Sequence, residues 1–280
     1  MNSLTNNCFD LVTTFCIFDD LVNMIFPNLY KTGRPRALSL SEIATICLIR
    51  TRYKINNLYA LYLLLVTKFS SDFTLPSYKN FVSAMNDYSP YLLTLVNILL
   101  SFNNKTAGTI KIVDSTPIPV CKNIRINSHK VMKRVASRSK STMGWYYGLK
   151  LHLLIDLKNN ILGLRFTTAK IGDRKVLDLF LNTLSNSIVL ADAGYLSSRL
   201  EKKAWDRFNI LLTPKRGNMK RISTLFQNFL LNFRSRIESV FSVLKERLGL
   251  ITSLPRSIKG YYSHLIRTMF SYMFQPLLVS

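Results

Sequence analysis

The sequence feature that most constrains the fold is a change in hydrophobic pattern at Asn103 and Asn104. Before these residues the chain is rich in Leu, and its apolar residues have helical spacing; after them, short β-branched and alternating segments begin. We therefore predict that the first third of the chain is all-helical. Ser39 and Glu42 form a capping-box pattern within it, which predicts the start of a helix.

The second part of the chain alternates strands and helices. A β-branched strand is expected over residues 109–113, ending at Asp114 before a break at Pro117 and Pro119. Next we expect a hairpin of strands 147–155 and 161–169 that turns at Asp156, and then a helix capped by Asp173. A strand over 188–191, ending at Asp192, is followed by a helix over 197–208 and a strand over 210–213. The last element is a long helix over 226–248, which Gly249 ends. This order predicts an α/β fold in which helices flank a mixed sheet.

The charge balance points to a polyanionic partner. The 280 residues include 38 Lys plus Arg against 15 Asp plus Glu, giving a net charge of +23, while 48% hydrophobic residues are enough for a folded core. Such an excess of positive charge opposes compaction unless an anion is bound, so nucleic acid is the expected partner. The longest uncharged run, residues 88–104, is too short to span a bilayer, and no export signal is recognisable, so we expect a cytoplasmic protein without a membrane partner.

Neither the cysteines nor the histidines form a recognisable site. Cys8, Cys16, Cys47 and Cys121 are scattered, so neither a zinc site nor a disulfide framework is expected. His152 alternates with the Leu residues of the hairpin, which places it on the opposite face of the sheet.

Two segments concentrate the basic residues. The first contains no acid and carries Lys122, Arg125, Lys130, Lys133, Arg134, Arg138 and Lys140. A solvated surface is the ordinary explanation for such a run, but the lack of counter-charges favours phosphate contact. Arg34 and Arg36 belong to the second segment, residues 31–36, which fits a DNA minor groove and a solvated linker equally well.

Three carboxylates are candidates for a metal site. Asp114 and Asp192 each follow a predicted core strand, and the ligand sites of such sheets gather at the carboxyl ends of strands. Neighbouring carboxylates repel one another unless they are protonated or a cation joins them, and their oxygens suit magnesium or manganese. Glu238 lies with Arg234 and Lys245 at the margin of the apolar face of the last helix. In this position Glu238 could be a third metal ligand, with Arg234 and Lys245 binding an anion beside it. An ordinary salt bridge between Arg234 and Glu238, four residues apart on the helix, explains the pattern equally well.

These residues carry a resemblance to a known family. Residues 112–115 read Ile-Val-Asp-Ser, residues 190–195 read Leu-Ala-Asp-Ala-Gly-Tyr, and the Arg234, Glu238 and Lys245 spacing is similar to a Tyr-Arg-Glu-Lys signature. The chain thus resembles the DDE transposases of bacterial insertion sequences, in particular the insertion-sequence-982-like group. Leu231 stands where that signature has Tyr, which leaves the activity of this copy open.

The resemblance implies an RNase H-like catalytic domain over residues 105–250, preceded by a helix-turn-helix-like DNA-binding domain over 1–104 and followed by a helical tail over 251–280. It implies that Asp114, Asp192 and Glu238 hold two Mg²⁺ ions, which Mn²⁺ can replace, while Arg234 and Lys245 bind phosphates. The implied reaction is strand cleavage at the element ends followed by strand transfer into target DNA.

The implied partners are the terminal inverted repeats and the target DNA, bound by a homodimer or larger assembly at the bacterial nucleoid. Two alternatives remain open: a repressor derived from a transposase that no longer catalyses, and a nuclease on the same fold.

Overall fold

The computed structural model describes residues 10–29, 37–142, 144–214, 224–252 and 255–278. Contacts divide the chain into two compact units. The first, the helical unit, comprises Met1–Asn97, Glu246–Leu250 and Lys259–Ser280; the second, the sheet unit, comprises Ile98–Lys245 and Ile251–Ile258. These units describe packing, and the functional boundaries at residues 104 and 250 stay a prediction.

The helical unit contains the helices predicted for the first third of the chain. They are α1 (Leu11–Ile25), α2 (Leu40–Arg52), α3 (Leu58–Lys68), α4 (Tyr78–Asp87) and the start of α5 (Ser89–Thr106), joined by most of α10 (Ile258–Phe274), after which a 3-10 turn spans Gln275–Leu278. The predicted capping box is confirmed, because the Glu42 amide donates to Ser39 Oγ at 3.1 Å and the Ser39 amide donates to Glu42 Oε2 at 2.6 Å.

Buried arginines join the C-terminal segments to these helices. Arg50 of α2 donates from Nη2 to the Leu248 carbonyl at 3.0 Å, and Arg267 of α10 donates from Nη1 to the Met85 carbonyl at 2.9 Å. Both side chains are almost fully buried, so these hydrogen bonds offset part of the cost of taking the guanidinium groups out of water.

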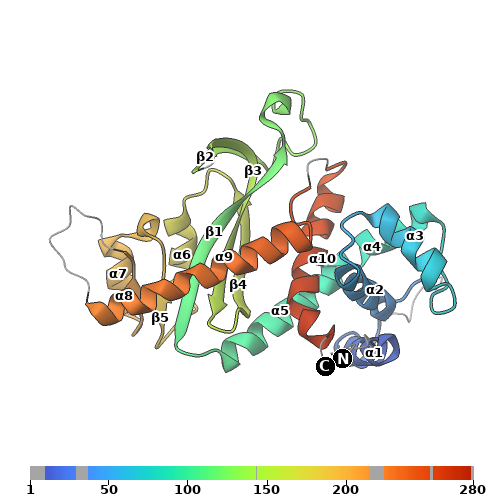
Figure 1. The fold of residues 1–280 in the computed structure, drawn as a ribbon, viewed down its shortest axis with the longest axis horizontal. Coiled ribbons are helices and arrows are strands. Elements are labelled where there is room, and N and C mark those ends of the chain that lie inside the picture. The colour runs from blue at the N-terminus through green and yellow to red at the C-terminus, as the bar shows by residue number, and fades with distance from the viewer. Residues whose placement is uncertain (1–9, 30–36, 143, 215–223, 253–254, 279–280) are drawn as a thin grey trace, which may run out of the picture. The chain divides into compact units, whose positions relative to one another are not determined.

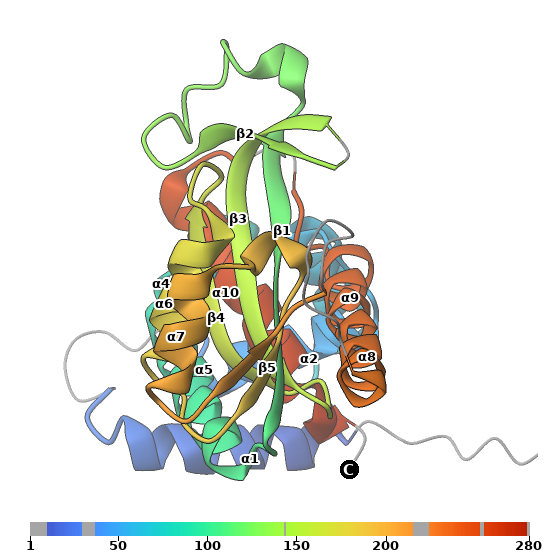
Figure 2. The same ribbon diagram turned by 90° about the vertical axis from the view of Figure 1, so that its left-hand side faces the viewer.

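The sheet unit is built around β1 (Ile110–Cys121). On one side β1 pairs antiparallel with β3 (Gly144–Asp156); on the other it pairs in parallel with β5 (Ile188–Leu190), which pairs in parallel with β6 (Ile210–Leu212). Both β2 (Ser137–Ser141) and β4 (Ile161–Thr168) pair antiparallel with β3 (Figure 2). The predicted mixed sheet is therefore confirmed.

Helices cover both faces of this sheet (Figure 2). On one face α6 (Asp173–Leu181) and α7 (Ser198–Trp205) bury a core that includes Val113, Leu154, Phe180 and Val189. The other face carries α8 (Leu225–Leu231) and α9 (Ser235–Ser242), joined by a 3-10 turn over Asn232–Arg234 and followed by a π-helical turn over Val243–Arg247. This continuous helical segment is the predicted long helix, and Gly249, with φ of 61°, ends it as predicted.

One strand is longer than predicted, because β1 continues through Pro117 and Pro119 to Cys121. The Ile188 amide donates to the Thr109 carbonyl, so the backbone groups of odd-numbered β1 residues point toward β5. Pairing with β5 ends at Ile112, so among the described residues no strand pairs with this edge of β1 beside Pro117 and Pro119. The backbone nitrogen of each proline faces this edge, where no N–H is needed for a ladder hydrogen bond. The predicted break at the prolines is therefore wrong.

The connection from β1 to β3 projects beyond the body of the sheet (Figures 1 and 2). It contains a 3-10 turn over Asn123–Arg125 and strand β2. We call residues 122–142 the basic arm.

Candidate active site

The register of the sheet brings Asp114 and Asp192 together. Ile112 of β1 and Leu190 of β5 form the last pair of the parallel ladder, and each aspartate lies two residues further along its chain. The two carboxylates therefore flank the same end of this strand pair. Ser115 points toward α6, so Asp114, the preceding strand residue, points to the opposite face, which α8 and α9 cover.

Asp114 has an environment that disfavours its charged form. The pKa of its carboxyl is raised from 3.8 to about 6, mainly by burial and to a smaller extent by the charges of Asp192 and Asp173, while the hydrogen bond from the Ser115 amide and the charge of Arg234 lower it. A crowded carboxylate of this kind is stabilised by a bound cation. The oxygens of Asp114 and Asp192 are thus a donor set that fits Mg²⁺ or Mn²⁺.

Arg234 lies at this site, in the 3-10 turn between α8 and α9. Its Nη2 donates to Asp192 Oδ1 at 2.8 Å, and the Asp192 side chain is 57% exposed. The sequence left open whether Arg234 forms a salt bridge with Glu238 or binds an anion. Among the described residues, the ion pair that Arg234 makes is with Asp192.

Glu238 is exposed on α9, beside β1 (Figure 1). Within the described ranges, no three His, Cys, Asp or Glu side chains are grouped so that they could hold a metal ion. The structure therefore does not bring Glu238 together with Asp114 and Asp192, and its role as third ligand stays a prediction. Lys245 is half-buried in the π-helical turn.

The basic arm is separate from the carboxylates. Its first base, Lys122, follows Asp114 by eight residues of mostly extended chain, a distance of roughly 25 Å. All seven predicted phosphate-binding side chains of the arm are exposed: Lys122, Arg125, Lys130, Lys133, Arg134, Arg138 and Lys140. The Arg138 guanidinium lies 4.9 Å from the ring centre of Trp145, which is 52% exposed. Arg34 and Arg36 lie outside the described residues.

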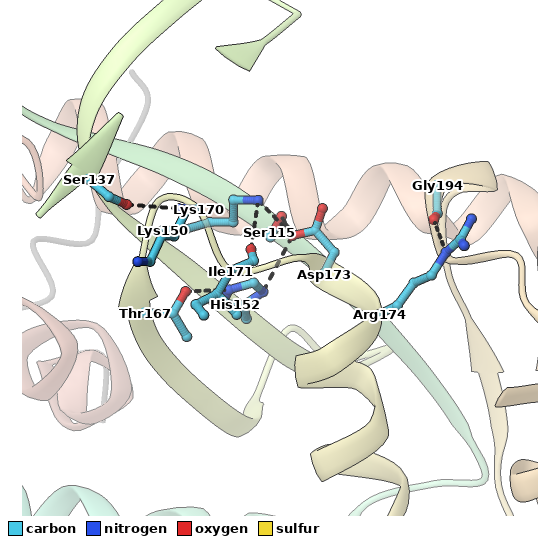
Figure 3. Close-up of polar contacts among 10 residues, drawn as sticks. All are labelled: Ser115, Ser137, Lys150, His152, Thr167, Lys170, Ile171, Asp173, Arg174 and Gly194. Atoms are coloured by element: carbon cyan, nitrogen blue, oxygen red, sulfur yellow. Dashed lines mark hydrogen bonds and ion pairs between the residues drawn. The ribbon is translucent and has the colours of Figure 1, made fainter. Parts of the chain in front are cut away.

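A polar cluster around Asp173 was missed by sequence reasoning (Figure 3). The predicted cap is wrong, since Gly172 is the N-cap and Asp173 is the first residue of α6. Asp173 Oδ1 instead accepts hydrogen bonds from Ser115 Oγ at 2.7 Å and Lys150 Nζ at 3.0 Å. The signal in the sequence was Lys150 and His152, two polar residues alternating along a strand that is otherwise Leu-rich.

His152 lies on the sheet face opposite to the hairpin Leu residues, as its alternation predicted. Its Nδ1 is 3.7 Å from Asp173 Oδ1, and its Nε2 is 2.9 Å from Thr167 Oγ1. Burial lowers the pKa of His152 to about 4, more than the Asp173 charge raises it, so the imidazole is neutral at pH 7.

Two further predictions concern residues outside the site. Asp156 is a turn residue as predicted, because its Oδ1 accepts from the amides of Lys158 at 2.8 Å and Asn160 at 2.9 Å. Cys16, Cys47 and Cys121 are free thiols, while Cys8 lies outside the described residues. In the described part of the chain, none of the helices has the length and apolarity needed to cross a bilayer.

The fold and the two carboxylates define a class: proteins in which a mixed sheet, covered by helices, carries acidic side chains just beyond the last pair of a parallel strand ladder. A profile of one family, described as "Transposase DDE domain", matches residues 104–257, which is more than half of the chain. The chain therefore belongs to this transposase family. The finer assignment to the insertion-sequence-982-like group stays a prediction.

The fold is also similar to that of a solved transposase structure. A cryo-EM structure of the piggyBac transposase synaptic complex with hairpin DNA aligns with 99% of this chain and 76% of that chain, at 9% identity and a TM-score of 0.53. At this identity the likeness shows the fold alone. The Mos1 transposase paired-end complex with left transposon end is 12% identical over 86% of this chain and 80% of that chain, with a TM-score of 0.25. No curated protein matches the chain.

Proposed function

We propose that this protein is a metal-dependent DDE transposase that cuts DNA at the ends of its own element and joins the freed ends to target DNA. The observation that carries the proposal is the side-by-side placement of Asp114 and Asp192 at the carboxyl end of a parallel strand pair, in a chain of the transposase DDE domain family. Burial, with a smaller contribution from the charge of Asp192, raises the pKa of Asp114, and a cation bound at this place would stabilise the charged carboxylate.

The residues that would hold the metal are Asp114 and Asp192, with Glu238 as the third ligand. We propose two Mg²⁺ ions, replaceable by Mn²⁺. When bound, such ions supply Lewis acidity that activates water or a 3′-hydroxyl and stabilises charge on the scissile phosphate. Arg234, which contacts Asp192, is proposed to bind a phosphate beside the scissile one. Lys245 is proposed to bind another phosphate near it.

DNA binding is proposed to use the basic arm and the helical first third of the chain in addition to the carboxylate site. The exposed bases of the basic arm would attract the DNA backbone at a distance from the carboxylates, and Arg34 and Arg36 would add contacts from outside the described residues. The helical first third of the chain, residues 1–104, would read the sequence of the terminal inverted repeats. Two ends must be brought together, so we propose a homodimer or larger assembly, bound to nucleoid DNA in the bacterial cytoplasm as the net charge of +23 favours.

The test uses labelled DNA from both flanks of the gene, a plasmid target, and Mg²⁺, Mn²⁺ or EDTA. We expect metal-dependent joining of flank ends to the plasmid by the purified protein, with Asp156→Asn as a matched substitution of a turn carboxylate outside the site. Cutting without joining would identify a nuclease, and binding without either reaction would identify a repressor.

A second experiment tests the third ligand. Glu238→Gln should abolish cleavage while end binding is retained, because the side chain is exposed and its amide is nearly the same size. Glu246→Gln, an exposed carboxylate eight residues further along, is the matched control. Cleavage that survives Glu238→Gln removes this residue from the metal site.

A further inference from the structure

The first two residues of α6 contact both chain segments that carry the proposed metal ligands (Figure 3). Asp173 Oδ1 accepts a hydrogen bond from Ser115 Oγ at 2.7 Å, and Ser115 directly follows Asp114. Arg174 Nε donates to the Gly194 carbonyl at 3.0 Å, and Gly194 lies two residues after Asp192. One end of a single helix is therefore bonded to the chain beside each carboxylate.

These contacts matter because the sheet itself does not fix the distance between the two carboxylates. The ladder between β1 and β5 ends at the pair of Ile112 and Leu190, and both aspartates lie beyond it. Past Ile112, β1 is held by β3 on one side alone in the described structure. The separation of the carboxylates consequently depends on contacts from outside the parallel pair.

Asp173 and the start of α6 are held firmly against the sheet. Its Oδ1 also accepts from Lys150 Nζ at 3.0 Å, and Lys150 belongs to β3, which is paired with β1 through this region. Behind it, Val176 and Phe180 of α6 are buried in the same core as Val113 of β1. The helix end is thus tied to the sheet by both polar and apolar contacts, so it does not move independently of the strands.

We propose that Asp173 and Arg174 form a positioning clamp that sets the separation of Asp114 and Asp192 required for metal binding. Both are positioning residues, because Asp173 acts through Ser115 and Arg174 acts through Gly194. The inference rests on the proposed function and deepens it, since hydrogen-bonded neighbours of metal ligands orient those ligands.

The test measures binding of Mn²⁺ alone to the full-length protein, by the electron paramagnetic resonance signal of free Mn²⁺. Asp173→Asn should weaken binding about tenfold, as loss of a hydrogen-bonded neighbour of a ligand commonly does. Arg174→Ala should weaken it by a smaller factor, because Arg174 is exposed and solvent competes for its single hydrogen bond. Because the Arg174 side chain is exposed, we expect Arg174→Ala to fold like the wild-type protein.

A matched control exists on the same helix. Asp178 of α6 pairs with Lys203 at 2.9 Å and Arg199 at 3.3 Å, away from the carboxylates, so Asp178→Asn should leave Mn²⁺ binding unchanged. Ser115→Ala removes the bond to Asp173 without changing any charge. If Ser115→Ala weakens Mn²⁺ binding as much as Asp173→Asn does, the effect comes from the lost hydrogen bond that positions Asp114. It does not come from loss of the negative charge of Asp173, which would attract the metal.

The outcomes distinguish the clamp from the proposed function. If the wild-type protein binds no Mn²⁺, or Asp114→Asn binds it equally well, the metal site is wrong and the clamp falls with it. If Asp114→Asn loses binding while Asp173→Asn and Arg174→Ala bind like the Asp178→Asn control, only the clamp is overturned. A loss confined to one of the two residues overturns the clamp as a pair.

Discussion

The carboxylate site and the basic arm are both connected to strand β1, which contains Asp114 and leads directly into the arm, but they are built in opposite ways. At the site, Asp192 is paired with Arg234, Asp173 is paired with Lys150, and Asp114 is crowded by both acids. The arm carries seven exposed bases, and no acid occurs anywhere between residues 115 and 155. The difference teaches that binding a metal requires fixed separations, whereas attraction of a phosphate backbone requires only density of charge.

The sharpest test of this comparison is to remove one carboxylate. Asp114→Asn should lower strand cleavage by more than the roughly 100-fold that loss of a neighbour of a metal ligand can cost, because a ligand itself is removed. Binding of the element ends should be nearly unchanged, since the arm is intact. A gel assay that measures cleavage and binding in the same samples checks this. Parallel loss of both would mean that site and arm are not separate.

The next prediction concerns the junction of the two regions at Gly148, which pairs with Pro119 of β1 and Ser137 of β2. A Cβ at residue 148 would lie 2.1 Å from the Ile118 carbonyl oxygen, and backbone cannot move aside as a flexible side chain can. Gly148→Ala should therefore lower the free energy of unfolding by roughly 3 kcal/mol.

Urea denaturation measures this change. Gly172→Ala is the matched control, since a Cβ there meets no atom within 4 Å. An equal effect of the two substitutions would show that β1 and β3 do not approach closely at the base of the arm.

The arm itself should affect affinity and salt dependence rather than chemistry. Replacing Lys130, Lys133 and Arg134 by Ala should reduce the slope of log K against log salt concentration by about 0.9 for each phosphate that the arm no longer neutralises. Binding titrations over a range of salt concentrations measure the slope. The triple replacement of Lys175, Arg199 and Lys202, exposed bases of α6 and α7, removes the same charge and should change the slope less. Equal slopes would leave the arm without a special role.

The smallest expected effect is on the pH dependence of stability. The pKa of Asp114 is raised from 3.8 to about 6, so the folded protein binds this proton more tightly than the unfolded chain. Stability is therefore lost as pH rises from about 4 to about 6, by on the order of 1 to 3 kcal/mol. Asp114→Asn removes this loss and should be more stable than wild type at pH 7.5.

The comparison has to be made between the variant and wild type, because His152 acts in the opposite direction. Its pKa is lowered to about 4, so it contributes stability that is lost as pH falls from 6.5 toward 4. Subtracting the two urea denaturation series cancels this contribution. A difference that does not change between pH 4 and pH 7.5 would contradict the raised pKa of Asp114.

Elements whose signals are local could be predicted from the sequence. Ser39 and Glu42, which are three residues apart, form the capping box of one helix. Asp156 accepts a hydrogen bond from the Asn160 amide within one turn, and Gly249 ends a helix because its φ is positive. Asp114 and Asp192 could be selected because each follows an apolar run that predicts a core strand, and the ligand sites of such sheets gather at the carboxyl ends of strands. Such features need only neighbours in the chain, so periodicity and residue type suffice to find them.

Which distant groups meet depends on the packing of the whole chain. Asp173 looked like a helix cap, yet it bonds Ser115, 58 residues away, and Arg234 bonds Asp192, 42 residues away, rather than the nearby Glu238. Pro117 looked like a strand break, yet it lies within β1 because β5 is too short to reach it. The physical reason is the same in each case: a side chain or backbone group takes the partner that packing brings to it, and local sequence does not encode which partner that is.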